Sequence, residues 1–538
     1  MSQFQLIDQT PGPDPKRIIL AVVAMSALLM VHSYFFSPAK ETKEAVLERA
    51  PEKELKENEV VAGRHKKATP ENLPEIKKEF FIKNGSDKLE RTSYLATVSN
   101  TGGMIDHLVL TDFSREKVLF DRNQKSILLA LSSKSAEDHL NENSKYELVS
   151  SDEKNISFSH ITPSGLKIDR NYEFLKQDVI KETILVKNLG EKPRRVELSL
   201  LLSKHQAIQK DGSFLSGPAP VNNVSLKSYT EFNKYAFKDL VEEKVWSPVH
   251  YIGFDDQYFL SVFIPEKEED IKLIRAKVNA DHGETANIEI ELSPQVLLSQ
   301  EEKLFEHKIF AGPKQIDLLS HMTPSLAENV DFGWLSALCR PMLWLLVKIY
   351  EQVGNFGLAI ILITILIKLL THPLTRKSYS SQAEMKKIAP KIQELSKKYG
   401  HDRALLGQKQ MELYREHGIN PMAGCLPLLI QLPIWFAFYR MLGFSVELYD
   451  QPFIGWIHDL TSPDPYYVLP LFMGGTMLIT QALTPMQLDN QPQMKYVLWI
   501  MPIFFTFIML NMPAGLSLYI LTNNLLTIAQ QIIIKKKA

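Results

Sequence analysis

The sequence predicts a membrane α-helical bundle with six transmembrane helices, five of them forming the core, combined with one large all-β sandwich domain. Apolar residues concentrate in long runs at the two ends of the chain, whereas the middle is charged. Within the middle, apolar and polar residues alternate, as they do in strands with one wet face. A length of 538 residues allows two or three domains, because one core could not fill it.

The overall composition excludes several function classes. A formal net charge of −1 gives no global field that would favour nucleic acid. The two cysteines, Cys339 and Cys425, lie beside or inside apolar runs, and we interpret them as small buried hydrophobic residues. The chain has no C-x-x-C spacing and no G-x-x-x-x-G-K-[ST] motif, so we expect no metal site, no cofactor and no ATP-driven pump.

The N-terminal apolar run, residues 18–36, is long enough to span a bilayer at about 1.5 Å per helical residue. The alternative is a cleaved signal peptide, but the proline within residues 37–39 makes a poor cleavage site. We therefore expect an uncleaved anchor at residues 17–37. Two basic residues precede the run, so residues 1–16 should stay in the cytoplasm and the segment after the anchor should be exported.

Two segments of different composition follow the anchor. Residues 38–78 are rich in Lys and Glu with almost no aromatic residues, which predicts a disordered linker. Residues 79–330 are predicted to form the β-domain, because they carry strand-like alternation and no comparable helical stretch before Pro313. The alternation is clearest at residues 168–174, 196–200 and 288–292, and turn signals occur at residues 100–103, 163–165, 188–190 and 281–283.

The β-domain gives no clear sign of chemistry. Its histidines are scattered among ordinary strand and turn residues: His160, His205, His250, His282 and His307. A sugar-binding or sugar-isomerising sandwich would need a histidine and a carboxylate to converge on a cleft, and the sequence leaves that alternative open. We favour a binding or scaffolding module and expect no catalytic residue.

An amphipathic helix is predicted at residues 331–350. Apolar residues recur with helical spacing, but Arg340 and Lys348 interrupt the run, which is therefore too short to span. Trp334 and Trp344 suit the boundary between lipid and water. We expect this helix to lie on the outer membrane surface.

Five further apolar segments predict five more spans. They are residues 354–372, 421–442, 467–484, 496–512 and 514–534, separated by a cytoplasmic hairpin (373–420), a periplasmic loop (443–466) and a cytoplasmic loop (485–495), with a basic tail at 535–538. Residues 376–415 carry ten Lys or Arg against four acids, whereas residues 443–466 carry four acids and no Lys or Arg. Placing the basic segments in the cytoplasm gives six crossings of the inner membrane with both termini inside. Several spans are short, which indicates either local bilayer thinning or misplaced segment ends.

The cytoplasmic hairpin is predicted from one apolar stripe. Its residues step by three and four along a helix, with Lys386 and Lys387 among the lysines elsewhere around that helix: Met385, Ile388, Ile392, Leu395 and Tyr399. Pro390 requires the helix to kink or begin there, Gly400 ends it, and Asp402 can cap a second helix. The hairpin could bind nascent chains, the ribosome or anionic lipid, or its charges could serve only to fix topology.

Lys368 is the informative polar residue of the predicted spans. A charge at the bilayer centre costs about 2.5–3.5 kcal/mol on insertion scales, so its presence suggests a use. The alternative is that the side chain reaches water from its position near the cytoplasmic end of the span. Gln431 and many polar residues of the last span accompany it, and they either join helices or line a wet cavity. We favour a polar chamber with one positive charge, open towards the cytoplasm.

The C-terminal region contains several long motifs in a specific order. They are NPMAGCLPLLIQLP at residues 420–433, and residues 373–375, 390–393, 456–460, 464–467, Pro470, residues 513–516, Asn524 and residues 530–531. In these motifs the region resembles the YidC/Oxa/Alb family of membrane protein insertases, and the resemblance covers the whole predicted membrane domain. The anchor, linker and β-domain resemble the Gram-negative form of the family, which implies a periplasmic β-supersandwich.

The resemblance implies a mechanism and a site. Family members insert and fold inner-membrane proteins, alone or with the Sec translocon, through a hydrophilic groove open to cytoplasm and lipid. Lys368 lies where the family has an Arg, so the charge is kept and the bidentate fork is lost. Thr364 and Tyr519 fall at substrate-contact positions, and Gln431 and Asn524 are further groove candidates.

The resemblance also implies partners: nascent membrane proteins, Sec components, the ribosome and membrane lipid, with the chain acting as a monomer and not as an enzyme. The alternative function is a polar-cavity transporter or channel with a periplasmic binding domain, which should show charges in several spans. A membrane-anchored periplasmic enzyme is a third possibility, but it would not need five further polar-lined spans.

Overall fold

The computed structural model describes residues 73–83, 93–113, 116–135, 137–206, 222–229, 231–247, 249–279, 284–419, 426–483 and 492–537. The predicted N-terminus (1–16), anchor (17–37) and most of the linker (38–78) lie outside these residues, as do the start of the third span and most of the loop at 485–495. The chain divides into two compact units, Met1–Lys66 with Leu488–Phe504, and Lys67–Gln487 with Phe505–Ala538. The second unit contains every element below except the first part of α9.

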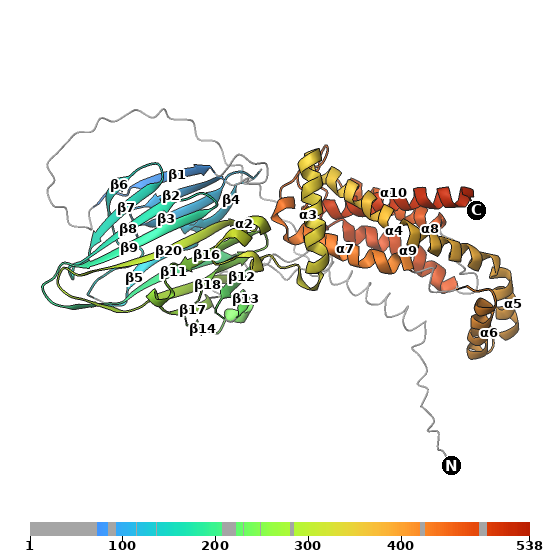
Figure 1. Ribbon diagram of the computed structural model, residues 1–538, viewed down its shortest axis with the longest axis horizontal. Helices are drawn as coiled ribbons and strands as arrows, with labels where there is room; N and C mark the ends of the chain where they lie inside the picture. Colours follow the sequence, from blue (N-terminus) through green and yellow to red (C-terminus); the bar gives the residue numbers. More distant parts are fainter. Residues whose placement is uncertain are drawn as a thin grey trace, which may run out of the picture. The chain divides into compact units, whose positions relative to one another are not determined.

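The β-domain consists of antiparallel strands in two large sheets (Figure 1). Among the described residues the first sheet has nine strands, namely β1 (Lys77–Lys83), β2 (Ser93–Ser99), β3 (Met104–Leu110), β4 (Lys117–Asp121), β5 (Ile127–Ser133), β11 (Leu198–Gln206), β14 (Lys244–Trp246), β17 (Ile271–Asn279) and β18 (Glu284–Leu292). The second also has nine, namely β6 (Glu147–Ser151), β7 (Asn155–Ile161), β8 (Leu166–Phe174), β9 (Val179–Asn188), β12 (Asn222–Lys227), β13 (Phe232–Ala236), β15 (Tyr251–Asp256), β16 (Phe259–Pro265) and β20 (Glu302–Pro313). A short ribbon pairs β10 (Arg194–Val196) with β19 (Gln295–Leu297).

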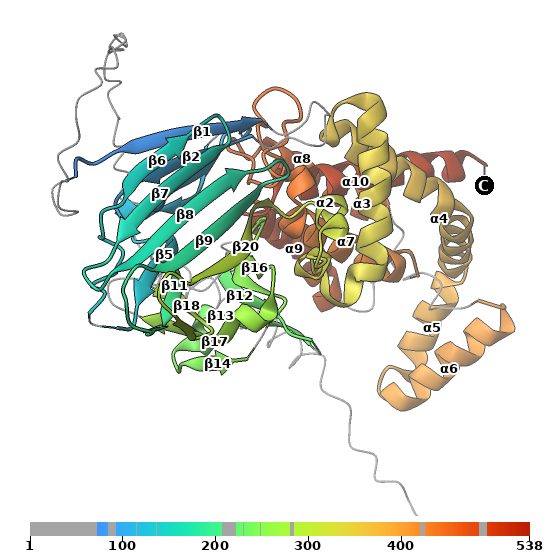
Figure 2. The ribbon, with the colours of Figure 1, turned by 60° about the vertical axis from the view of Figure 1, so that its left-hand side comes forward.

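Alternating burial explains why the two sheets form a sandwich (Figure 2). In β8 every second residue is buried, as the sequence pattern predicted. The buried side chains of both sheets share one apolar core, with Ile168 and Ile184 from the second sheet and Leu200 and Ile288 from the first. The predicted β-sandwich is therefore confirmed. Strand β1 begins at Lys77, inside the predicted linker, because its pairing with β2 extends back to that residue.

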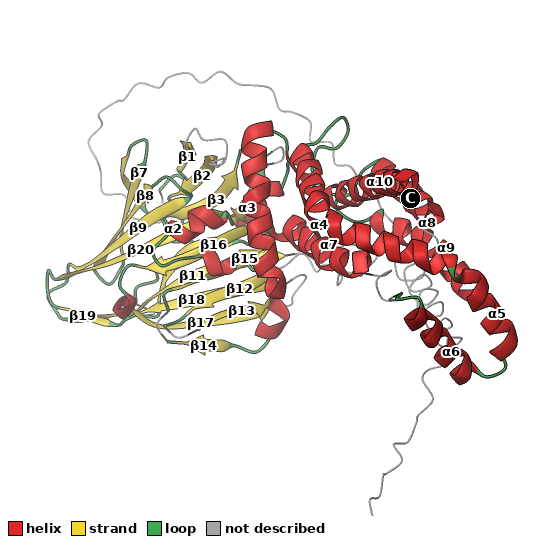
Figure 3. Ribbon diagram, turned by 45° about the vertical axis from the view of Figure 1, so that its right-hand side comes forward, coloured by secondary structure: helices red, strands yellow, loops and turns green. Residues whose placement is uncertain are grey.

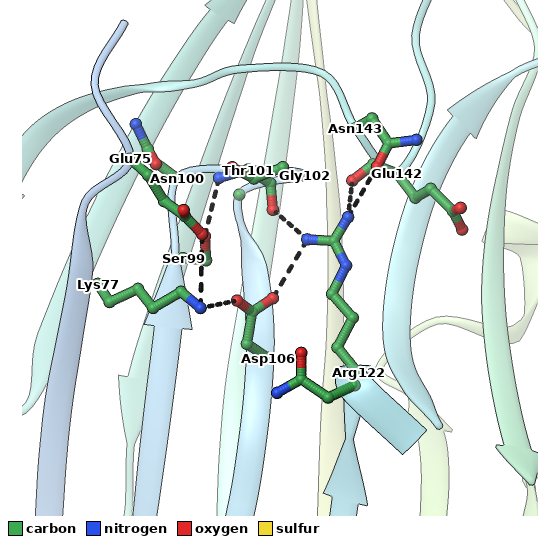
Figure 4. A network of polar contacts seen from close by, with 12 residues as sticks. Glu75, Lys77, Ser99, Asn100, Thr101, Gly102, Asp106, Arg122, Glu142 and Asn143 are labelled. Carbon is green, nitrogen blue, oxygen red and sulfur yellow. Dashed lines mark hydrogen bonds and ion pairs between the residues drawn. The ribbon is translucent and has the colours of Figure 1, made fainter. Parts of the chain in front are cut away.

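A polar network holds the glycine turn before β3 (Figure 4). Gly102 and Gly103 have φ angles of +77° and +56°, and a Cβ at Gly102 would lie 2.6 Å from the carbonyl oxygen of Glu142. Arg122 donates hydrogen bonds to that same carbonyl oxygen at 3.0 Å and to the Asp106 carboxylate at 3.3 Å. The turn signal in the sequence therefore reflects a real need for glycine, and Arg122 connects the turn to the neighbouring loop.

The remaining described segments are mostly helical (Figure 3). They are α2 (Ile316–His321), α3 (Ser336–Val353), α4 (Phe356–Lys387), α5 (Ala389–Tyr399), α6 (Arg403–Glu416), α7 (Leu426–Phe444), α8 (Val468–Leu483), α9 (Pro492–Met509) and α10 (Ala514–Lys537). Helix α10 runs through the three lysines that we had predicted to be a separate tail at 535–538, because nothing in that basic segment breaks a helix.

Helix α4 differs most from its prediction. The predicted span ended at residue 372, whereas the helix continues without interruption through Pro373 to Lys387. Hydropathy locates the apolar part of a helix, and the polar residues after Pro373 still favour helical structure. The predicted stripe of the hairpin is therefore divided: Met385 belongs to α4, Ile388 lies at the break, and Ile392 belongs to α5.

The other signals of the hairpin are confirmed. Helix α5 begins at Ala389 with Pro390 in its first turn, and Gly400 follows its last residue. Asp402 caps α6, because its carboxylate accepts hydrogen bonds from the backbone N–H groups of Ala404 and Leu405, both at 3.0 Å.

Among the described residues, one helical segment is long and apolar enough to cross a membrane by length and composition, Phe356–Ser381. Val468–Leu483 and Trp499–Met509 are shorter apolar helices. The number of crossings, six, stays a prediction.

Helix α3 has the amphipathic character that the sequence predicted. Trp334, just before it, and Trp344 are 83 % and 64 % exposed, whereas Met342 and Leu346 are buried. The helix ends at Val353 and is capped by Gly354, which has a φ of +68° and donates its N–H to the carbonyl oxygen of Tyr350 at 2.7 Å. An exposed aromatic face of this kind suits a lipid–water boundary.

Candidate functional site

Lys368 lies on α4 and faces α10. Its Nζ donates a hydrogen bond to the Thr527 hydroxyl at 2.9 Å, and the side chain is half-buried. No carboxylate of the described residues forms an ion pair with it. The ammonium group therefore has a neutral hydrogen-bond partner on the neighbouring helix α10.

Three other predicted groove residues, Gln431, Tyr519 and Asn524, form contacts between helices. The Gln431 amide on α7 donates to the Tyr519 hydroxyl on α10, and the Tyr519 ring stacks on Phe438 with centroids 4.2 Å apart. Asn524 on α10 donates to the Thr476 hydroxyl on α8 at 3.3 Å. Together these contacts bring α7, α8 and α10 into one polar cluster.

Thr364 makes no such connection. Its hydroxyl donates to the carbonyl oxygen of Ile360 on its own helix at 2.6 Å, and the side chain is 1 % exposed. Tyr519 is equally buried, at 1 %. Both alternatives that the sequence left open, contacts that join helices and a wet cavity, stay predictions for these positions.

Three further polar contacts were not predicted. Below Lys368 on α4, His372 lies 3.4 Å from the amide nitrogen of Gln530, and the Tyr379 hydroxyl accepts from the Gln531 amide at 3.2 Å. Thr527, the partner of Lys368, belongs to the same seam between α4 and α10. The helical spacing of 368, 372 and 379 was the available signal in the sequence.

The apolar stripe of the hairpin packs inside the hairpin itself. Ile388 and Ile392 are buried with Ile419, and Met385 packs against this cluster with Leu413 and Tyr414. Leu395 and Tyr399 are half-buried, Lys387 is exposed, and the side chain of Lys386 lies outside the described residues. The apolar stripe therefore contributes to the core of the hairpin, whereas the exposed surface of the hairpin carries lysines such as Lys387.

A histidine and a carboxylate do converge in the β-domain, but inside its core. His307 Nε2 lies 2.8 Å from Glu182 Oε2, and Arg170 Nε donates to Glu182 Oε1 at 2.7 Å. The side chains of Arg170 and Glu182 are 0 % exposed and that of His307 is 2 % exposed. A substrate could not reach this pair, so it does not support the sugar-isomerising alternative.

The β15–β16 turn contacts the end of α7. Gln257 donates to the carbonyl oxygen of Gly443 at 2.7 Å, and the Tyr258 hydroxyl donates to that of Leu442 at 3.0 Å. These are carbonyl groups of the last turn of a helix, which have no partner within it. Tyr449, in the loop after α7, packs against the Tyr258 ring with centroids 4.7 Å apart.

Glu447 in the same loop connects to α2, since its carboxylate accepts a hydrogen bond from the backbone N–H of Ile316. Burial raises the pKa of Glu447 from its ordinary 4.5 to about 7, with a smaller contribution from the charge of Asp317. Between pH 4.5 and about 7, the Glu447 carboxyl is therefore protonated in the folded protein and ionised in the unfolded chain.

This pKa shift predicts a stability that falls with pH. The contribution of Glu447 is fully present below pH 4.5 and is lost as pH rises towards about 7, at a cost of at most about 3 kcal/mol. Glu447→Gln keeps the acceptor for Ile316 without the charge, so unfolding of the full-length protein in detergent should lose this part of its pH dependence. An unchanged slope between pH 5 and pH 8 in the variant would contradict the assignment.

Comparison with known proteins covers both halves of the chain. Residues 88–345 match the family described as YidC periplasmic domain, and residues 348–538 match the family described as 60Kd inner membrane protein. A protein from Geotalea uraniireducens called membrane protein insertase YidC is 33 % identical over 540 residues, covering 97 % of this chain and 99 % of the relative. One of the same name from Geobacter metallireducens is 32 % identical over 543 residues, covering 97 % and 98 %.

Solved structures are more distant. A crystal structure described as an active YidC insertase with its first transmembrane domain resolved is 18 % identical, covers 84 % of this chain and 93 % of that chain, and has a TM-score of 0.37. A galactose mutarotase-like protein from Lactobacillus casei is 9 % identical, covers 44 % of this chain and 100 % of that chain, and has a TM-score of 0.34.

The relatives decide the class of function. Membrane protein insertion is a non-enzymatic function, so the relatives' shared name confirms the prediction that the chain is not an enzyme. Similarity over nearly the whole length includes both the β-domain and the helical region. The chain belongs to the YidC family of membrane protein insertases, inner-membrane proteins with a periplasmic domain.

Proposed function

We propose that this chain inserts and folds inner-membrane proteins through a positively charged hydrophilic groove that opens to the cytoplasm and to lipid. The observation that carries the proposal is the environment of Lys368, whose ammonium contacts the neutral Thr527 hydroxyl. A half-buried positive charge with no carboxylate partner among the described residues can attract the acidic tail of a substrate.

Such a groove would shorten the distance that a polar segment of the substrate must travel through hydrocarbon. Moving a polar tail through hydrocarbon costs several kcal/mol for each unsatisfied group. A wet half-channel removes part of that cost, and the apolar helix of the substrate gains free energy as it enters lipid. No nucleotide and no covalent step is needed.

Substrate contact requires the helices to separate. Thr364 and Tyr519 are buried in this arrangement, and Gln431 is bonded to Tyr519. We therefore propose that movement of α7 away from α10 breaks the Gln431–Tyr519 contact and opens these side chains to the substrate. Asn524 on α10 is a further proposed contact.

The proposal includes a topology and partners. Six crossings with both termini in the cytoplasm follow from the charge asymmetry of the sequence. Nascent membrane proteins are the substrates. The Sec translocon, the ribosome and membrane lipid are proposed partners of a functional monomer. The basic outer surface of the hairpin, including Lys387, would supply contacts to the ribosome or to anionic lipid.

Reconstitution tests the proposal directly. Purified full-length protein in liposomes, without ATP, should convert a small single-span substrate with an acidic tail into a protease-protected form. Empty liposomes set the background, and a matched substrate with a neutral tail tests the role of charge. Insertion well above background, and greater for the acidic tail, is the expected result.

An absence of insertion would contradict the proposal. If folded protein gives no more insertion than empty liposomes, autonomous insertion is contradicted. Adding purified Sec translocon to the same liposomes would then show whether the chain acts only as a Sec-dependent chaperone.

A further inference from the structure

The Thr527 hydroxyl has a fixed direction. It donates its one hydrogen to the carbonyl oxygen of Asn523, one turn back on α10, at 2.7 Å. The oxygen therefore presents only lone pairs to Lys368, whose Nζ lies 2.9 Å away. A hydroxyl that is bound in this way can accept from the ammonium but cannot turn to donate.

We propose that Thr527 is a positioning residue that holds the Lys368 ammonium on the α10 side of the groove and orients its remaining N–H groups for a substrate carboxylate. This inference rests on the proposed function of Lys368. An ammonium has three donors, of which Thr527 takes one. Because Thr527 is neutral, the contact fixes the position of the charge without cancelling it.

A lysine needs such a contact more than an arginine would. The guanidinium of arginine is a planar fork that is already organised for a carboxylate, whereas lysine is a point charge on a flexible stem. Binding a substrate to an unheld lysine would include the cost of ordering that stem. In this chain, which has Lys368 at the position, Thr527 restricts the stem before the substrate arrives.

Nearby threonines show that the arrangement is specific. Thr371 and Thr375 on α4 also donate to carbonyl oxygens of their own helix, at 2.9 and 3.0 Å. In the described contacts neither hydroxyl accepts from a lysine, so a back-bonded threonine is not by itself a lysine partner. Thr375, which is buried, is therefore a matched control for loss of a threonine hydroxyl in this helix pair.

The experiment compares Thr527→Val, Thr527→Ser and Thr375→Val as full-length proteins in liposomes, with acidic-tail and neutral-tail substrates. Valine keeps the shape and removes the acceptor, so Thr527→Val should lower the insertion rate of the acidic-tail substrate by about tenfold, the size of one lost hydrogen bond to a charged group. Insertion of the neutral-tail substrate should not change. Serine should restore the rate, and Thr375→Val should behave as the wild type.

A second arm separates positioning from packing. In a Lys368→Arg background, Thr527→Val should cost little, because arginine needs no external orientation. Equal losses for both substrates, or the same loss in the arginine background, would assign Thr527 to helix packing and overturn the proposal.

A third measurement does not depend on insertion. Labelling of Lys368 by a membrane-permeant amine reagent, followed by mass spectrometry, should be faster in Thr527→Val than in wild type and Thr375→Val. Equal labelling rates would overturn the proposal whatever the insertion assay gives. If the wild type does not insert above empty liposomes, the proposed function fails, and the labelling result still decides whether Thr527 holds Lys368.

Discussion

Replacing Lys368 by alanine should lower insertion of an acidic-tail substrate by at least about tenfold, because two charges roughly 4 Å apart interact by about 4 kcal/mol near a protein surface. The loss should be large because Lys368 is the only Lys or Arg of α4 before Arg376. The rate of protease-protected insertion in liposomes measures the effect. Lys368→Arg should retain activity, since it preserves the charge.

The control for this prediction is a lysine outside the proposed groove. Lys348 on α3 is exposed and pairs with Glu351 at 2.9 Å, so Lys348→Ala should insert at the wild-type rate. If Lys368→Ala also inserts at that rate, the ammonium only reaches towards water, and the polar groove without its charge would be the active feature.

The sequence predicted elements well where a local pattern has one physical cause. The alternation at residues 168–174 reappears as β8, with every second side chain buried. Asp402 and Pro390 mark helix starts that the structure confirms, because a cap and a first-turn proline act within a few residues. These signals do not depend on the rest of the fold.

Prediction was weaker for α4, in which an apolar segment and a polar segment form one continuous helix. The predicted end of the second span at residue 372 marked where hydropathy falls, yet α4 continues to Lys387. The apolar stripe predicted for one hairpin helix is divided between α4 and α5, with the break at Ile388. Periodicity alone cannot distinguish one helix from two consecutive helices whose apolar residues pack in the same cluster.

The sequence could propose candidate site residues but not their contacts. Lys368 and Asn524 were proposed because polar groups are costly inside a membrane. Their partners Thr527 and Thr476 lie on other helices, and the choice depends on how those helices are rotated. The contacts of Gln257 and Tyr258 with the end of α7 had no signal at all, since ordinary turn residues supply them.

Glu182→Ala should destabilise the β-domain by about 3–5 kcal/mol, because it leaves Arg170 buried without its counterion. The loss of stability should affect both sheets, because Arg170 contacts both of them. Arg170 on β8 also donates to the carbonyl oxygens of Gly102 and Leu129, both at 2.9 Å, and Leu129 belongs to the opposite sheet. Pulse proteolysis of the full-length protein in urea, read from fragments of the β-domain, measures the loss.

The pH dependence of this cluster has a definite sign. Burial alone would raise the pKa of Glu182, but the charge of Arg170 and the contacts with Arg170 and His307 hold it below its usual value. A lowered carboxylate pKa contributes stability at neutral pH that is lost as pH falls through the folded pKa. Acid should therefore destabilise the wild type more than Glu182→Ala.

A neighbouring ion pair provides the matched control. Glu306 on β20 pairs with Lys181 on β9 at 2.9 Å, but their side chains are 30 % and 32 % exposed. Glu306→Ala should cost no more than about 1 kcal/mol, because water replaces the lost partner. If both variants cost the same, burial would not explain the importance of Glu182. A large loss for Glu182→Ala alone would show that burial makes the Glu182–Arg170 pair important for stability.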